Sequence, residues 1–285
     1  MSTVAYWQCR DRSLDLGVPV VMGVLNVTPD SFSDGGRFAD HEAALLHARR
    51  MIEEGAGIID IGGESTRPGA NPASVEEELA RVVPVIEALR RESAVFISVD
   101  TSKPEVMRAA CAAGADIIND VRALTEPEAL AAAASTRAGV CLMHMKGEPR
   151  TMQAAPSYVD VVREVSAFLV ARLAACRAAG IDNSRLTADP GFGFGKRIVD
   201  NLVLLKHLSR LRELGVPLAV GLSRKSMLAR LTGRGVDDRT AGSVALAAIA
   251  VLNGARIVRA HDVAATVDAI RVAAAVSQGE GFDGT

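Results

Sequence analysis

Excess positive charge, long apolar runs and an apolar leader are all missing from the sequence. It carries 32 Lys and Arg against 34 Asp and Glu, a formal net charge of -2, so it has no surplus charge for nucleic acid or an anionic membrane. The longest Ala-rich stretch, residues 241–255, is too short to span a bilayer and contains Gly242, Ser243 and Asn253. The first residues are charged early and lack a signal-peptide core. These absences favour a globular protein of the cytoplasm.

Cysteine and histidine are few and dispersed. The four cysteines include no Cys-x-x-Cys pair, and three of them lie in apolar helix or strand patterns, so we expect reduced core thiols rather than metal ligands or disulfides: Cys9, Cys111, Cys141 and Cys176. No Ser-His-Asp arrangement is legible, and no cluster of His and Cys suits a transition metal. The Gly-rich residues 191–196 lack the G-x-G-x-x-G spacing of a dinucleotide site. We expect a core or supporting place for His144 and solvated helix faces for His41, His47 and His207.

A strand followed by a helix recurs eight times along the chain. Apolar runs typical of buried strands cover residues 20–25, 57–63, 95–100, 116–121, 139–145, 186–191, 217–223 and 256–262. Helical spacing covers 39–54, 74–92, 103–113, 126–137, a long segment ending at 179, 201–214, 242–252 and 263–276, with a further turn at 227–231. Without a linker or composition break, eight units predict a single (β/α)8 TIM-barrel domain over residues 1–285, with its core at about 18–277. An open doubly wound sheet is the alternative, and residues 5–16 predict a short hairpin or lid.

Chemically capable side chains follow almost every predicted strand. They are Asn26, Thr66, Arg67, Asp100, Asn119, Asp120, Met143, His144, Asp189, Ser223, Arg224, Lys225, Arg259 and His261. Because the carboxyl ends of barrel strands form the active site, we expect these residues to converge there. Asp100 and Asp120 have a plainer reading, in which each caps the following helix.

The first of these strand ends opens a polar loop over residues 26–36. It carries one amide, two carboxylates and three hydroxyls, and Phe32 has no evident core to join. Pro29 restricts the backbone and the Gly35-Gly36 pair permits positive φ, so the segment predicts an exposed, shaped loop. We expect Asn26 to be a fixed ligand and residues 28–36 to form a mobile cover.

The types of side chain suggest a division of labour. Asn119 and Asp189 can hold the edge of a flat heterocycle, while Lys225 donates to a ring carbonyl oxygen. Apolar walls would come from Met143, Ile117 or Ile118, and the pair Phe192 and Phe194. Arg67, Arg259 and His261 suit a phosphate or diphosphate, and Ser223 before two cations favours an anion. Asn26 could hold Mg2+ that arrives with diphosphate.

Five segments together resemble the dihydropteroate synthase family in its bacterial, single-function form. The matching segments are residues 25–36, 60–69, 189–196, 221–226 and 259–262, in the family's order between about residues 21 and 263. The resemblance implies a homodimer formed through the last helices, and a transferase of folate biosynthesis. It would condense 6-hydroxymethyl-7,8-dihydropterin diphosphate with 4-aminobenzoate to 7,8-dihydropteroate and diphosphate.

The resemblance also implies site residues. The pterin would contact Thr66, Asp100, Asn119, Met143, Asp189, Phe194, Gly221, Lys225 and Arg259. The diphosphate would contact Asn26, Thr66, Arg67, Arg259 and His261, with Mg2+ on Asn26. The 4-aminobenzoate site, which sulfonamides imitate, would contain Phe32, Arg67, Pro68, Phe194, Ser223, Lys225 and Ser226. Catalysis would rest on Asn26, Asp100, Lys225 and Arg259.

These residues predict an SN1-like substitution, because the aniline nitrogen is already nucleophilic and leaving-group departure is the difficult step. Asp100 would offset the positive charge that develops on the pterin. Two alternatives remain at this point. One is a pterin-binding paralogue without synthase activity, and the other is a methyltetrahydrofolate-dependent methyltransferase domain, which would have no use for the first two loops.

Overall fold

Eight parallel strands form the centre of the molecule in a computed structural model that describes residues 6–28, 36–65, 72–148 and 151–279. The strands are β3 (Val20–Asn26), β4 (Ile58–Gly62), β5 (Phe96–Asp100), β6 (Ile117–Asp120), β7 (Gly139–Met143), β8 (Leu186–Asp189), β9 (Ala219–Gly221) and β10 (Ile257–Ala260). Their order is β8-β7-β6-β5-β4-β3-β10-β9. A bridge between Ala188 and Leu218 joins the two ends of this sheet, and the Ala188 amide donates to the Pro217 carbonyl at 3.0 Å. The predicted (β/α)8 barrel is therefore confirmed, and the open sheet is excluded.

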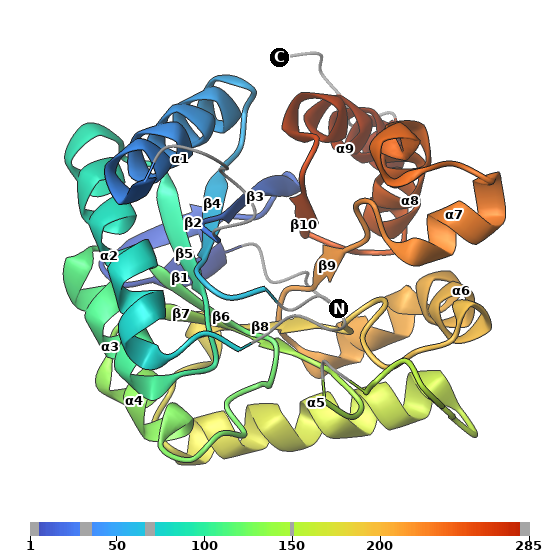
Figure 1. Cartoon of the computed structure of the whole chain (residues 1–285). Coiled ribbons are helices and arrows are strands. Elements are labelled where there is room, and N and C mark those ends of the chain that lie inside the picture. Colours follow the sequence, from blue (N-terminus) through green and yellow to red (C-terminus); the bar gives the residue numbers. More distant parts are fainter. Residues whose placement is uncertain (1–5, 29–35, 66–71, 149–150, 280–285) are drawn as a thin grey trace.

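Helices surround the barrel between successive strands (Figure 1). They are α1 (Gly36–Glu53), α2 (Val75–Glu92), α3 (Pro104–Ala113), α4 (Ala129–Ser135), α5 (Val161–Ala178), α6 (Ile198–Lys206), α7 (Ser226–Thr232), α8 (Thr240–Leu252) and α9 (Val263–Gln278). Short 3-10 turns are η2 (Asn183–Arg185), η3 (Leu208–Leu214) and η4 (Val236–Asp238). The helix that we predicted at 201–214 begins at Ile198 and continues after His207 as η3. The one at 126–137 begins only at Ala129, because Glu128 has a φ of 62°.

Strand alternation divides the apolar side chains into two cores. Val99, Val140 and Val220, with other outward-facing strand residues, pack with the helices in one large cluster. Met22, Ile58 and other inward-facing residues from most of the strands form a smaller cluster inside the barrel, together with residues that precede β3. Since the inner cluster fills the amino-terminal half of the barrel, the carboxyl-terminal half is left for polar side chains.

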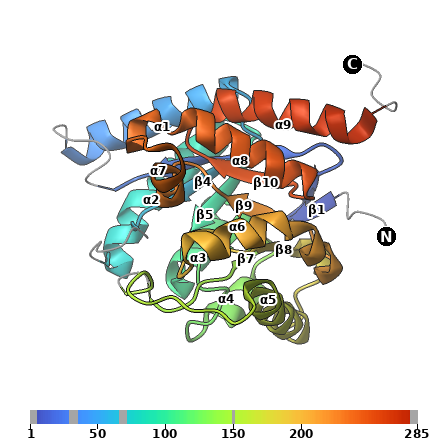
Figure 2. The same cartoon turned by 90° about the vertical axis from the view of Figure 1, so that its right-hand side faces the viewer.

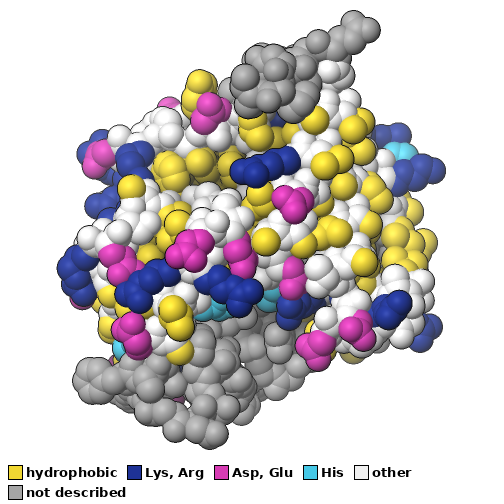
Figure 3. Space-filling view, turned by 90° about the horizontal axis from the view of Figure 1, so that it is seen from above, with side chains coloured by type: hydrophobic (Ala, Val, Ile, Leu, Met, Phe, Trp, Pro, Cys, Tyr) yellow, Lys and Arg dark blue, Asp and Glu magenta, His cyan; other side chains and the backbone are white. Residues whose placement is uncertain are grey.

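The last two long helices, α8 and α9, lie side by side (Figure 2) and leave apolar side chains uncovered. Exposed members are Ile249, Leu252, Val272 and Val276. Hydrophobic atoms gather over this region in the right-hand half of Figure 3. None of the helices within the described ranges is long and apolar enough to cross a membrane.

The predicted hairpin is confirmed as β1 (Tyr6–Cys9) and β2 (Arg12–Asp15), but it is not a lid over the strand ends that carry the polar residues. Fully buried Trp7 belongs to the inner core and donates through Nε1 to the Arg185 carbonyl, 2.8 Å away and just before β8. Gly139, the first residue of β7, provides the space, since a Cβ there would lie 3.0 Å from the indole. The hairpin thus closes the amino-terminal end of the barrel.

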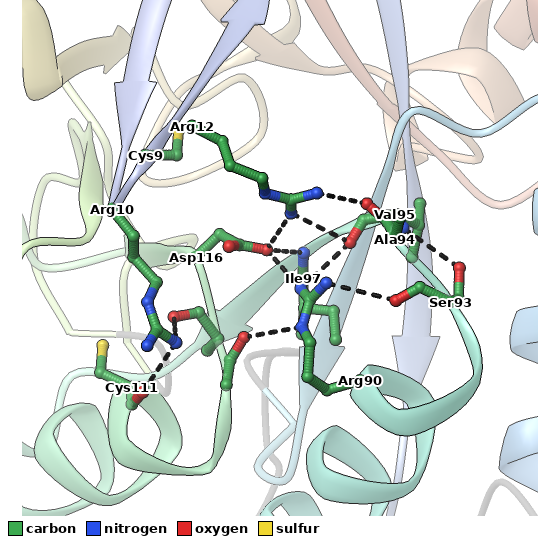
Figure 4. A network of polar contacts seen from close by, with 12 residues as sticks. Cys9, Arg10, Arg12, Arg90, Ser93, Ala94, Val95, Ile97, Cys111 and Asp116 are labelled. Atoms are coloured by element: carbon green, nitrogen blue, oxygen red, sulfur yellow. Dashed lines mark hydrogen bonds and ion pairs between the residues drawn. The ribbon is translucent and has the colours of Figure 1, made fainter.

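Arginines fasten this hairpin to the barrel around one buried carboxylate (Figure 4). Asp116 Oδ2 accepts from Arg12 at 2.8 Å, from Arg90 at 2.5 Å and from the Ile97 amide at 3.0 Å. Arg10 donates to the Cys111 carbonyl at 3.1 Å.

All four cysteines are free and buried, as predicted.

Candidate active site

The pairing register brings the predicted strand-end residues into one ring. Along the ladder, Asn26 pairs with Gly62, Gly62 with Asp100, and Asp100 with Asn119. Met143 pairs with Asp189, and Gly221 with Arg259. Each of these positions comes two or four residues after an inward-facing residue lower on the same strand. It therefore faces the inside of the barrel as well. Their side chains therefore point into the carboxyl-terminal mouth of the barrel.

Arg259 is the centre of this ring. Its Nε donates to Asp60 Oδ2 at 2.6 Å and its Nη2 to Asp100 Oδ2 at 2.8 Å. Burial alone would lower the pKa of Arg259, but Asp60 and Asp100 raise it above its ordinary value. A guanidinium has five N–H donors, so three remain for a ligand after these two ion pairs. The two carboxylates thus fix the plane of a cation that still has donors to offer.

Asp60 is the residue that sequence reasoning missed. It is fully buried in β4, and its Oδ2 also accepts from Asn119 Nδ2 at 3.1 Å. It therefore joins Arg259 to Asn119, two residues that we predicted without a link between them. The signal was available, because one carboxylate in the apolar run 57–61 needs a buried partner. Its Oδ1 has no hydrogen-bond partner among the residues that the structure describes.

Two buried carboxylates in the ring are poised to titrate near neutrality. Burial raises the pKa of Asp100 to about 7; Arg259 opposes this shift and Asp60 adds to it. Burial also raises the pKa of Asp189 to about 6, although its Oδ1 accepts from the Gly191 amide at 2.7 Å. Both groups would gain from a ligand that donates a hydrogen bond to the ionised form.

Lys225 reaches the ring from the start of α7. Burial lowers its pKa to about 8; Arg259 lowers it further, while Asp189 and Asp100 raise it. Its Nζ lies 4.2 Å from the centre of the Phe194 ring, a cation–π contact. Gly193 leaves room for this arrangement, since a Cβ there would lie 3.1 Å from Lys225 Cδ. The ammonium and the half-buried ring form one wall of the mouth, and Ser226 is exposed beside them.

His261 and Ser223 meet between the ends of β9 and β10. Ser223 Oγ accepts from the His261 amide at 3.2 Å and lies 3.1 Å from its Nδ1. Burial, together with Arg259 and Arg224, lowers the pKa of His261 to about 4. The imidazole is therefore neutral near pH 7 and offers one N–H, not a positive charge, to an anion.

Several predicted participants are placed away from the ring. Arg224 forms a two-point ion pair with Asp262, at 3.1 and 2.5 Å, so only one of the two cations after Ser223 faces the site. Phe192 and Ile118 are buried in the outer core, which leaves Met143 and Phe194 as apolar walls, and Ile117 belongs to the inner core below. The wall roles predicted for Ile118 or Ile117 and for Phe192 were therefore wrong. Ile118 points to the opposite side of β6 from Asn119, and Ile117 points inward but lies below the mouth. Phe192 enters the outer core from a loop that has no strand or helix alternation.

The supporting place expected for His144 is confirmed, whereas Asp120 does not cap the following helix, because α4 begins only at Ala129. Asp120 accepts from the Arg122 and Leu124 amides, at 2.8 and 2.7 Å, and from Ser102, so it caps a turn. His144 is buried, as expected, and lies edge-on to Phe168. The predicted roles of Phe32, Thr66, Arg67 and Pro68, and the part of the predicted 28–36 cover over residues 29–35, concern residues outside the described ranges; Gly36 is the first residue of α1.

The mouth can accommodate a hard cation that brings its own oxygen ligands. Within the described ranges, no group of three His, Cys, Asp or Glu residues could hold a metal ion unaided. Asn26 and Asp100 instead bring side-chain oxygens together beside Gly62, where a Cβ would lie 3.8 Å from Asn26 Oδ1 and 4.0 Å from Asp100 Oδ2. The donors are oxygens, which Mg2+ prefers, but phosphate and water would have to complete its shell.

Comparison with known proteins gives a consistent family. Residues 22–261 match the family described as pterin binding enzyme. The dihydropteroate synthase of Escherichia coli K12 is 56% identical over 263 residues, covering 92% of this chain and 93% of its own length. A Yersinia pestis dihydropteroate synthase with a sulfonamide drug superimposes with a TM-score of 0.92 at 51% identity, covering 96% of this chain and 100% of that one. The Xanthomonas albilineans enzyme in complex with 7,8-dihydropteroate gives 0.87 at 55% identity, covering 95% and 98%.

Proposed function

The chain belongs to the dihydropteroate synthases, transferases that form 7,8-dihydropteroate, and from that premise we propose how its barrel mouth performs the reaction. The substrates are 6-hydroxymethyl-7,8-dihydropterin diphosphate and 4-aminobenzoate, and diphosphate is the second product. The observation that carries the proposal is the inward-facing ring around Arg259, which combines buried carboxylates, an amide and a lysine in one mouth. The comparisons weigh against the methyltransferase alternative, because the relatives that they match are synthases.

The pterin half of the site combines donors and acceptors for a flat ring. Asp189 accepts from the N–H edge of the pterin, Asn119 supplies a donor and an acceptor, and Lys225 donates to the ring carbonyl oxygen. Met143 and Gly221 border the same space, one apolar and one without a side chain. Burial of Asp189 favours this role, because a desolvated carboxylate gains much from a two-point hydrogen bond.

Departure of diphosphate is the step that the protein must assist. Arg259 directs its remaining N–H groups at the leaving oxygens, and His261 adds one neutral donor; Thr66 and Arg67, from outside the described ranges, are assigned here by resemblance. Asp100, 2.8 Å from Arg259, offsets positive charge as the bond from the pterin carbon to the leaving oxygen lengthens. The substitution is therefore SN1-like, and no general base is required.

Mg2+ fits the oxygen-lined space at Asn26 and, when bound with diphosphate, would neutralise part of the leaving group's charge. Phe194, Lys225 and Ser226, with Ser223 behind them, border the place proposed for 4-aminobenzoate; Phe32, Arg67 and Pro68 join them by resemblance. This second substrate attacks the carbon from which diphosphate departs, and its nitrogen then loses a proton to solvent.

The experiment that tests the proposal is release of diphosphate by the purified protein. We expect release that requires both 4-aminobenzoate and Mg2+ and that matches the dihydropteroate formed. A folded protein that binds the pterin but releases no diphosphate would instead support the paralogue that only binds.

The apolar surface of α8 and α9 supports a homodimer, and the four reduced cysteines support a cytoplasmic location. Ile249 and Val272, both exposed, are suitable probes of the dimer. Replacing them with Glu should convert a dimer to monomers in sedimentation velocity; an unchanged dimer would place the interface elsewhere.

A further inference from the structure

A buried lysine lies beneath the glycine-rich loop that follows β8. Lys196 is only 3% exposed, and its Nζ has acceptors on two different loops. The Gly191 carbonyl lies 2.8 Å away and the Phe194 carbonyl 3.2 Å away, both in its own loop. His144, which follows β7, contributes Nδ1 at 2.9 Å. The His144 carbonyl lies 3.4 Å away as well, so the three N–H groups of the ammonium have four acceptors within reach.

The shape of the loop depends on tertiary contacts and one turn, in which the Phe194 amide donates to the Gly191 carbonyl at 3.1 Å. Gly191, Gly193 and Gly195 all have positive φ, and the loop has no helix or strand hydrogen bonds. It is pressed against the segment after β7, since a Cβ on Gly191 would lie 1.9 Å from the His144 carbonyl oxygen. Side chains hold the rest: Asn201 Oδ1 accepts from the Gly193 amide at 2.7 Å, and the Tyr158 hydroxyl donates to the Gly195 carbonyl at 2.9 Å.

We infer that Lys196 is a positioning residue for the 4-aminobenzoate half of the site. It ties the loop to His144 and thereby holds the Phe194 ring beside Lys225. The inference rests on the proposed function, because 4-aminobenzoate is the ligand that this wall would contact. Lys196 itself is covered by the loop and does not reach the mouth.

The groups around Lys196 suit a structural role, in which the side chain stays in one place and does not react. Burial lowers the pKa of His144 to about 3, so its ring is a neutral acceptor at working pH. Burial also lowers the pKa of Lys196 to about 7, and nearby Asp189 opposes that shift. The pterin contacts proposed for Asp189 and Asn119 come from strands β8 and β6, and the loop reaches Asp189 through the Gly191 amide, which donates to its Oδ1 at 2.7 Å. Loss of the lysine should therefore disturb the two substrates unequally.

The test compares Lys196→Met with Lys206→Met, which removes an exposed lysine from the same part of the chain. For Lys196→Met we expect the KM for 4-aminobenzoate to rise about tenfold, while the KM for the pterin diphosphate changes less than about threefold. Lys206→Met should match the unmodified protein. An equal rise in both KM values, or none, would overturn the inference.

A second variant protects the test against misfolding of Lys196→Met. Tyr158→Phe removes one hydrogen bond to the same loop and keeps the aromatic ring. We expect the KM for 4-aminobenzoate to rise about threefold and the KM for the pterin diphosphate to stay unchanged. If Lys196→Met is insoluble and Tyr158→Phe leaves that KM unchanged, the inference fails. An unmodified protein without synthase activity would refute the proposed function instead, so the two failures are distinguishable.

Discussion

The two ends of the barrel use buried carboxylates in opposite ways. At the amino-terminal end, a single Asp116 oxygen accepts from two arginines and a backbone amide, and this network joins the hairpin to the strands. At the carboxyl-terminal end, one arginine is shared between two carboxylates. Asp60 there keeps an oxygen without a partner among the described residues. A carboxylate oxygen that already accepts three hydrogen bonds indicates a structural role. A carboxylate oxygen and guanidinium N–H groups without partners among the described residues indicate a place where a ligand binds.

The interior of the barrel follows the same division. The lower layer is apolar and closed by Trp7. On the inward faces of β4, β5 and β8, Asp60 Oδ1 and the Ser98 and Thr187 hydroxyls are buried without hydrogen-bond partners in the described part of the chain. Such groups reduce stability by about 1 to 3 kcal/mol each when unsatisfied.

Removing a pterin contact should have the largest effect. Asp189→Ala deletes a buried carboxylate that accepts two hydrogen bonds in the proposed complex, so pterin affinity should fall at least about a hundredfold. Isothermal titration calorimetry with the pterin measures this loss, and circular dichroism checks that the fold is intact. Unchanged affinity would remove Asp189 from the pterin site.

A smaller loss is expected from neutralising the residue that holds Arg259. Asp60→Asn keeps the shape and can keep an oxygen at the position that accepts from Arg259 and Asn119, but it removes the negative charge beside Arg259, so kcat/KM should fall about tenfold to a hundredfold. Initial-rate measurements at saturating Mg2+ would show it. Asp116→Asn, the same substitution at the other end, is the matched control. Equal activity of the two variants would contradict the contrast between the ends.

The pH profile of kcat/KM should show the same site at work. Asp100 and Asp189 act as carboxylates, with pKa values raised to about 7 and about 6, so activity should fall as pH drops through this range. Lys225, whose pKa is lowered to about 8, loses its charge above that value, so activity should also fall on the alkaline side. The apparent pKa values on the acid and alkaline sides of the profile belong to interacting groups and not to single residues. A flat profile from pH 5.5 to 9 would count against these roles.

Much of the fold could be predicted from the sequence, because the same strand-and-helix unit repeats along the chain. Eight apolar runs, each followed by a helical pattern, define the barrel, and polar residues at strand ends must then share one mouth. The alternation of each strand even predicts which residues point inward. The end that the hairpin would cover was not legible, because a segment before the first strand can fold over either opening.

The wrong predictions at the site have two causes. One is contacts between loops that are distant in sequence, and the other is a loop whose residues follow neither helical nor strand periodicity. Arg224 and Asp262 are 38 positions apart, and nothing local to either shows that they neutralise each other. Phe192 and Phe194 alternate with left-handed glycines, so no helix or strand period assigns one to the core and the other to the mouth. The link that Asp60 makes between Arg259 and Asn119 likewise depends on three strands meeting.

The smallest effect on activity should come from the hairpin end. Asp116→Asn removes the charge that two arginines share, and leaving their half-buried guanidinium groups without it should lower the free energy of unfolding by about 1 to 3 kcal/mol. Urea denaturation followed by circular dichroism measures this loss. At a temperature well below the midpoint of thermal unfolding, kcat and both KM values should stay within about twofold of the unmodified protein. A large change in either KM would mean that the hairpin end is coupled to the mouth, and that the barrel does not separate support from chemistry.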